Sequence, residues 1–216
     1  MVSTAEQTLA TLQKHFMVDG NPVVAPDGKI QASQDVVLKH KFNTPFEKLP
    51  VEFSHIGGGL MVSNNTLKTL EGCPETLGRS FECDNNELQS LEFGPKQIGL
   101  SGEGGHYICS QNQLVNLVGA PREIPGVFNC AANPLKSLKG FPQKIGRLLY
   151  ITYDSRLPLL RTLAAPEIIF WPFPNADSDA VKVLNILKYY LSKGKRAMFD
   201  CQKELEDAGF GDNARW

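Results

Sequence analysis

The stretch FECDNNELQSLEFGP (81–95) alternates apolar and polar residues and then reaches a pair of asparagines. Phe81 and Cys83 are separated by one residue, which is the spacing of side chains on one face of a β-strand. Asn86 follows them, and Leu88 and Leu91 come after it. A buried asparagine is tolerated where its amide bonds backbone groups that would otherwise stay unpaired. The stretch therefore predicts a short strand that ends in a bend at the asparagine.

The same pattern returns along the chain. The aligned segments are LMVSNNTLKTLEGCP (60–74), FECDNNELQSLEFGP (81–95), YICSQNQLVNLVGAP (107–121), FNCAANPLKSLKGFP (128–142) and a looser LYITYDSRLPLLRTLAAP (149–166). Successive steps are 21, 26, 21 and 21 residues between the aligned positions Asn65, Asn86, Asn112, Asn133 and Asp154. The longer step contains the insertion SGEGG (101–105). A fixed period of this size indicates a solenoid, in which successive coils stack on one another.

Three of the five cysteines, Cys83, Cys109 and Cys130, occupy the same inward position of the repeat. Free cysteine behaves as a small apolar side chain in a protein core. The odd number of cysteines also favours free thiols over a disulfide framework. We therefore expect a stacked column of buried cysteines without catalytic or metal-binding roles.

The repeats resemble the short leucine-rich repeats that read LxxLxLxxNxL. They resemble more closely a group of repeat proteins common in bacteriophage genomes, which reads GxFxCxxNxLxSLxGxP. Members of that group often carry a segment like DGxxxxxxDVxL near the start and one like CQKxLxxAGFxxNARW at the end. This chain has PDGKIQASQDVVL (26–38) and CQKELEDAGFGDNARW (201–216). It departs from the group at Phe93 before Gly94, at the SGEGG insertion, and at Arg156, where an inward leucine is expected.

The fold class that follows is α+β: a leucine-rich-repeat-like β-solenoid of about five turns of about 21 residues, with a cap at each end. We expect an N-terminal helix and β cap over 1–56, the solenoid over 57–172 and a C-terminal helical cap over 173–216. Residues 3–16 predict an amphipathic helix, and 28–56 a hairpin or degenerate first repeat. Two further helices are expected after residue 177, the first facing the solenoid with Val181, Leu184, Leu187 and Leu191.

The overall composition is that of a folded protein with a formal net charge of −1. This charge argues against a partner bound by electrostatics alone, such as the DNA backbone or an anionic membrane. The first residues lack the features of a signal peptide, and the chain has no apolar run long enough to span a membrane. We therefore expect a cytoplasmic protein. Known phosphate-loop, zinc and hydrolase motifs do not occur, which predicts a non-enzymatic protein without a cofactor or metal.

In a repeat coil, the residues that face outward along the strands are left for binding. An apolar and aromatic patch beside a polar rim is typical of a protein interface. The alternative is that the C-terminal helices or the segment FWPFP (170–174) cover the apolar half of this face. The outward positions that we expect to bind a protein are Met61, Glu82, Asp84, His106, Ile108, Asn129, Tyr150 and Tyr153.

The resemblance to bacteriophage-encoded proteins implies a partner in the bacterial host cytoplasm. We expect the chain to bind and block a host protein, such as a component of defence or transcription. A nucleic-acid-binding accessory protein is one alternative, and a structural component of the virion is another. The basic residues that would serve nucleic-acid binding surround the turn between the last two helices, at Lys188, Lys193, Lys195 and Arg196.

Overall fold

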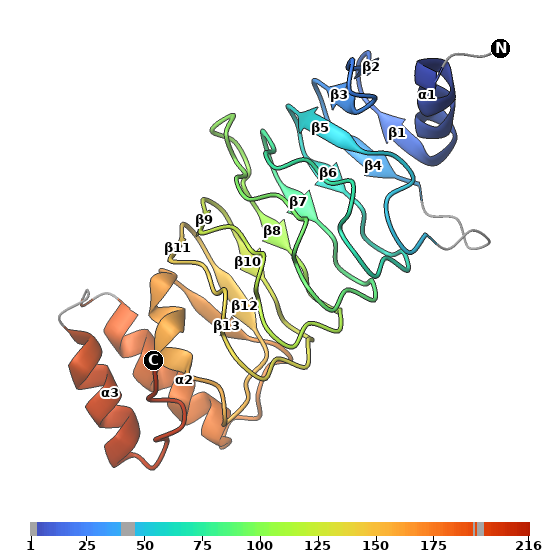
Figure 1. The fold of residues 1–216 in the computed structure, drawn as a ribbon. Helices are drawn as coiled ribbons and strands as arrows, with labels where there is room; N and C mark the ends of the chain where they lie inside the picture. The colour runs from blue at the N-terminus through green and yellow to red at the C-terminus, as the bar shows by residue number, and fades with distance from the viewer. Residues whose placement is uncertain (1–3, 40–45, 192, 194–196) are drawn as a thin grey trace.

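The computed structural model describes residues 4–39, 46–191, 193 and 197–216. Two of the basic residues predicted above, Lys195 and Arg196, lie outside these ranges. Figure 1 shows an elongated molecule in which a ladder of short strands runs from one helix-bearing end to the other. The strands of the main sheet follow one another in the order β1-β4-β6-β7-β8-β10-β12-β13. Their sequential order along the molecule is that of a β-solenoid.

All neighbours from β4 to β13 are parallel, since each coil returns the chain to the same edge before the next strand begins. Among the described residues, these seven strands make about six coils, so the expected number of five turns is one too few. The coil before the first clear repeat and the strand after the last one lack the asparagine that defines the pattern. The parallel strands are β4 (Val36–Leu38), β6 (Leu60–Met61), β7 (Phe81–Glu82), β8 (Tyr107–Ile108), β10 (Phe128–Asn129), β12 (Leu149–Ile151) and β13 (Ile168–Phe170).

The N-terminal end contains helix α1 (Thr4–His15) and strand β1 (Phe16–Val18), which pairs antiparallel with β4. The helix ends one residue earlier than predicted because the buried Phe16 already belongs to the strand. A second sheet contains the hairpin of β2 (Val23–Val24) and β3 (Ile30–Ala32), with β5 (Phe53–Ile56) alongside β3. A two-stranded sheet of β9 (Glu123–Ile124) and β11 (Lys144–Ile145) lies along one edge of the solenoid.

The inward positions form two continuous columns in the core. The first column is apolar or aromatic at every coil, and the second includes the predicted stack of cysteines, all free and fully buried. Burial raises the pKa of the Cys83, Cys109 and Cys130 thiols, which keeps them protonated. The columns are Leu60, Phe81, Tyr107, Phe128 and Leu149, and Val62, Cys83, Cys109, Cys130 and Ile151.

A column of three buried asparagines, Asn86, Asn112 and Asn133, joins neighbouring coils in the middle of the solenoid. The Asn112 amide nitrogen donates to the carbonyl oxygens of Cys109, in its own coil, at 3.2 Å and of Cys83, in the preceding coil, at 3.0 Å. Its Oδ1 accepts a hydrogen bond from the backbone N–H of Leu88 at 3.0 Å. Asn86 and Asn133 repeat this arrangement. The sequence prediction that these amides satisfy backbone groups at the bends is therefore confirmed.

Close stacking of the coils explains several glycines. A Cβ atom on Gly78 would overlap the carbonyl oxygen of Gly57 in the preceding coil. Another glycine column is formed by Gly72, Gly119 and Gly140, which all have positive φ. The equivalent residue in the second repeat is Phe93, whose φ is 65° and whose side chain is exposed. A left-handed conformation is costly for a bulky residue, so Phe93 stores local strain in this turn.

At the C-terminal end, helices α2 (Asp179–Leu191) and α3 (Met198–Asp207) pack against each other and against the 3₁₀ helix η1 (Leu159–Ala164), and α2 also packs against β13. Helix α2 buries Ala180, Val183 and Leu187. Leu184 and Leu191 are partly buried against the same core, so three of the four residues predicted to face the solenoid do so. Val181 does not belong to this core, and the smaller Ala180 and Val183 are buried there instead.

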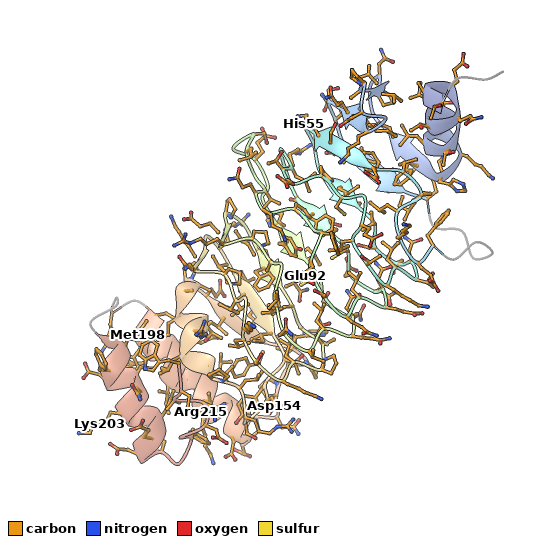
Figure 2. The ribbon with its side chains drawn as sticks, in the orientation of Figure 1. His55, Glu92, Asp154, Met198, Lys203 and Arg215 are labelled. Carbon is orange, nitrogen blue, oxygen red and sulfur yellow. The ribbon has the colours of Figure 1, made fainter. Side chains whose placement is uncertain are left out.

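The C-terminal tail closes the last coil. The Asn213 amide nitrogen donates to the carbonyl oxygens of Asp154 at 3.1 Å and of Leu157 at 2.9 Å. Leu157 fills the inward position at which Arg156 was noted as a departure, and Arg156 turns outward. Figure 2 shows Arg215 and Asp154 at this same end of the molecule. The buried Asn213 thus does for the final bend what the repeat asparagines do for the earlier ones.

Candidate protein-binding face

The outward side chains of the parallel strands form one surface, which we call the ladder face. Strand register places Met61 beside Glu82, Glu82 beside Ile108, Ile108 beside Asn129, and Asn129 beside Tyr150. Five of the predicted residues therefore lie in a single row across five strands. The row continues at both ends, to Val37 on β4 and Ile169 on β13.

The C-terminal helices do not cover this row. They lie beyond β13, at the end of the solenoid, as Figure 1 shows. The row itself, from Met61 to Tyr150, stays partly exposed. The FWPFP segment contributes a side chain beside the row, because Trp171 lies next to Tyr150 in a shared hollow.

This hollow, which we call the aromatic hollow, has a volume of about 300 Å³. It lies at the C-terminal end of the ladder face, where the side chains after β8, β10 and β13 surround the outward residues of β10 and β12. No acidic or basic residue is among those that line it. The lining residues are Ser110, Gln111, Asn129, Ala132, Tyr150 and Trp171.

Backbone hydrogen bonds fix Trp171 in the hollow. It follows Phe170, which is buried, so strand alternation directs the indole outward. The Trp171 N–H donates to the carbonyl oxygen of Ile151 at 2.9 Å. The Thr152 hydroxyl donates to the Trp171 carbonyl oxygen at 2.8 Å and accepts from the Ala132 N–H at 2.7 Å. These bonds hold three neighbouring coils together beneath the hollow.

Aromatic surface extends beyond the hollow. The rings of Trp171 and Phe173 meet edge to face, with their centroids 4.9 Å apart. Their side chains remain exposed, with Trp171 at 45% and Phe173 at 68%. Exposed aromatic side chains that share a rigid support are typical of the centre of a protein interface.

Tyr153 does not belong to this exposed group. Its ring packs against Phe170 with the centroids 5.4 Å apart, and its hydroxyl donates to Asn213 Oδ1 at 3.5 Å. Burial, with the negative charges of Asp179 and Asp154, raises the pKa of Tyr153. The structure therefore places Tyr153 against the C-terminal tail and away from the aromatic hollow.

The other end of the ladder face is acidic. The Ser63 hydroxyl donates to Asp84 Oδ1 at 2.5 Å, across neighbouring coils. Glu82 precedes Asp84 by two residues and faces the same way. Partial burial is the main cause that raises the pKa of Glu82, and the negative charges of Asp84 and Asp35 raise it further. This acidic pair can attract a basic group of a partner to one end of the face.

His106 lies at the edge of the ladder face, just before β8. Its Nδ1 accepts a hydrogen bond from the backbone N–H of Val127 at 2.9 Å, so this nitrogen carries no proton. Burial lowers the pKa of His106 from its ordinary value of 6.5, and the positive charge of Arg147 lowers it further by a smaller amount. His106 therefore holds the next coil in place as a neutral acceptor.

We expect the folded protein to lose stability on acidification through His106. A lowered folded-state pKa gives a contribution that is complete above about pH 6.5 and is lost as the pH falls through the folded-state value. The His106→Asn variant keeps an acceptor but does not titrate. Urea midpoints measured between pH 7.5 and 5.0 should fall more steeply for the wild type than for the variant. Parallel curves for the two proteins would contradict this role, since the two proteins differ only at position 106.

Of the basic residues predicted to bind nucleic acid, the structure describes Lys188 and Lys193. Lys193 lies over the ring of Tyr189, with Nζ 3.4 Å from its centroid, and it is also near Tyr190 at 5.6 Å. Lys188 is exposed on α2. Lys193 is therefore engaged in a local cation–π contact. The structure does not place Lys188 and Lys193 on the ladder face.

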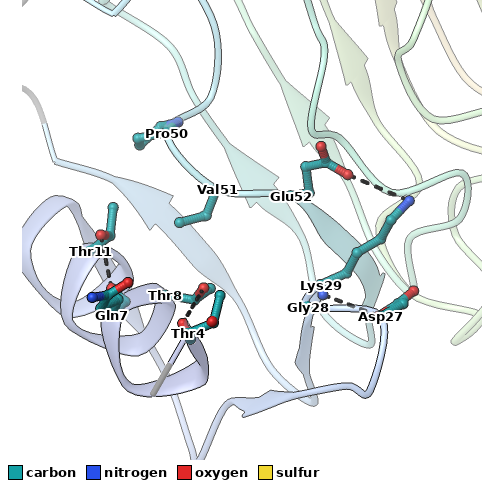
Figure 3. A pocket seen from close by; sticks show the side chains of 10 residues that line it. All are labelled: Thr4, Gln7, Thr8, Thr11, Asp27, Gly28, Lys29, Pro50, Val51 and Glu52. Carbon is teal, nitrogen blue, oxygen red and sulfur yellow. Dashed lines mark hydrogen bonds and ion pairs between the residues drawn. The ribbon is translucent and has the colours of Figure 1, made fainter. Parts of the chain in front are cut away.

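A second hollow of about 330 Å³ lies at the N-terminal end, between α1 and the loops that precede β3 and β5. Figure 3 shows that several of the residues that line it are bonded to one another. The Thr8 and Thr11 hydroxyls donate to the carbonyl oxygens of Thr4 and Gln7, each at 3.0 Å. Lys29 and Glu52 form an exposed ion pair at 3.5 Å. These contacts engage the hydroxyls of Thr8 and Thr11 and the charges of Lys29 and Glu52 within the protein itself.

Comparisons of the chain with protein-family models, with curated proteins and with solved structures found no match. No described helix is long and apolar enough to cross a membrane. Within the described residues, no group of three or more histidine, cysteine, aspartate or glutamate side chains is arranged to hold a metal ion.

Proposed function

We propose that this chain is a non-enzymatic, leucine-rich-repeat-type scaffold that binds another protein through its ladder face. The observation that carries the proposal is the combination, on one rigid face, of the exposed aromatic pair Trp171 and Phe173 with the outward row that includes Tyr150. The acidic pair of Glu82 and Asp84 forms the other end of the contact.

The mechanism is steric. The asparagine column and the bonds through Thr152 fix the backbone before a partner arrives, so binding costs little ordering of loops. A partner that lies along the row is covered over the width of several coils. In keeping with the phage-like repeats and C-terminal segment, we propose that this partner is a protein of a bacterial host and that binding blocks one of its functional surfaces.

The test compares capture from bacterial lysate by the tagged wild type, by Tyr150→Ala and by a Glu82→Lys, Asp84→Lys double variant. The control is Glu87→Lys with Glu92→Lys, which makes the same charge change in the same coil away from the outward row. We expect one host protein to be captured by the wild type and the control and to be reduced at least tenfold with both ladder variants. Equal capture by all four proteins would overturn the proposal.

A further inference from the structure

The side chains that line the aromatic hollow restrict which segments of a partner protein can bind there. Asn129 Oδ1 already accepts a hydrogen bond from the Ala131 N–H at 3.2 Å, which leaves the Asn129 amide nitrogen as the free group. The lining residues Gln111, Tyr150 and Trp171 carry an amide, a hydroxyl and an indole N–H, each of which includes a hydrogen-bond donor. The residues that line the hollow therefore supply several donors and carry no charge.

The spacing of Tyr150 and Trp171 also indicates which backbone conformation a bound segment has. Tyr150 is paired with Ile169 on the neighbouring strand, and Trp171 lies two residues beyond Ile169. With strands about 4.8 Å apart and a rise of about 3.3 Å per residue, the Tyr150 and Trp171 Cα atoms are about 8 Å apart. A polyproline II helix rises about 3.1 Å per residue with three residues per turn, so its side chains repeat about every 9 Å.

We infer that the aromatic hollow binds a proline-rich, extended segment of the partner protein. Proline has no backbone N–H, so such a segment presents carbonyl acceptors to the donors of the hollow. Its rings pack on the faces of Tyr150 and Trp171, and its fixed φ reduces the ordering cost of binding. An uncharged segment also suits a lining without acidic or basic residues, whereas a phosphorylated or strongly charged segment would leave its charge unpaired.

The inference rests on the proposed function, since it names the part of the partner that the ladder face holds. The test uses the full chain with Trp216→Phe, which leaves Trp171 as the remaining tryptophan of the two in the sequence. Indole fluorescence is followed during titration with a ten-residue polyproline peptide, a glycine–serine peptide of equal length, and a neutral trisaccharide. We expect saturable binding of polyproline alone.

Three variants locate the binding. Tyr150→Ala and Gln111→Ala should each weaken polyproline binding about tenfold. Alanine is accommodated at position 111, because Ala132 has nearly the same φ in the next coil (55° against 54°). Gln113→Ala removes an exposed amide of the same coil outside the hollow, so it should leave the affinity unchanged. Circular dichroism checks that all variants fold.

Absence of a response to polyproline, an equal response to the glycine–serine peptide, or a response to the trisaccharide alone would each overturn the inference. Its failure is distinguishable from failure of the proposed function. A host protein that is captured by the wild type and lost with Tyr150→Ala, together with no polyproline binding, would support the ladder face while removing the proline-rich segment.

Discussion

Replacement of Asn112 by alanine should lower the free energy of unfolding by about 3 kcal/mol. The Leu88 N–H is left buried without its acceptor, which costs about 1–3 kcal/mol, and the hydrogen bonds to Cys83 and Cys109 are lost at about 1 kcal/mol each. Part of this cost is relieved because Asn86 still donates to the Cys83 carbonyl oxygen. Urea denaturation followed by circular dichroism measures the change.

The control is Gln113→Ala, one residue further along, where the side chain is exposed. We expect a change within about 0.5 kcal/mol for this variant. If Asn112→Ala and Gln113→Ala had similar stabilities, the asparagine column would not be what holds the coils together. The same comparison can be repeated at Asn86, which makes an equivalent set of bonds.

Substitution of Gly78 by alanine should be still more damaging, with a loss of about 4 kcal/mol or more. The added Cβ would overlap the Gly57 carbonyl oxygen, and this atom belongs to the backbone of the preceding coil. Relief would require the two coils to separate, which breaks the hydrogen bond from the Gly78 N–H to the Ile56 carbonyl oxygen at 3.0 Å. Thermal unfolding and the yield of soluble protein report the effect.

Gly211→Ala is the matched control. Nothing lies within 4 Å of a Cβ built at this position, and its φ is not in the left-handed range. We expect its melting temperature to stay within a few degrees of the wild type, since surface changes of this kind alter stability by less than about 0.5 kcal/mol. A Gly78→Ala protein as stable as Gly211→Ala would show that the coils are stacked less closely than the structure has them.

Residues that recur with the period of the coil could be predicted from the sequence. The inward columns, the bend asparagines and the row from Met61 to Tyr150 each depend on a position that returns in every repeat. Stacking of equivalent positions is a direct consequence of the solenoid, so the repeat determines which residues are neighbours. The repeat therefore predicts that these outward residues form a row, as the strand register shows, while their role in binding a partner stays a prediction.

Features that occur only once along the chain could not be obtained in this way. Trp171 follows the last recognisable repeat, and only the alternation through Ile169 and Phe170 could have indicated its outward direction. Asn213 comes from a tail without periodicity, yet it bonds the last coil. The buried face of α2 depends on how closely the helix meets η1, which the pattern of leucines alone does not specify.

The asparagine bonds described above also bear on how such a protein changes its length over evolutionary time. Each of these amides joins its own coil to the one before it, so a duplicated unit of 21 residues, such as 112–132, would bring its own connector with it. Unequal recombination between neighbouring units would then extend the molecule by about 4.8 Å, and the added unit would carry its own core residues. The solvent-facing positions of the copy would be free to diverge toward a different target.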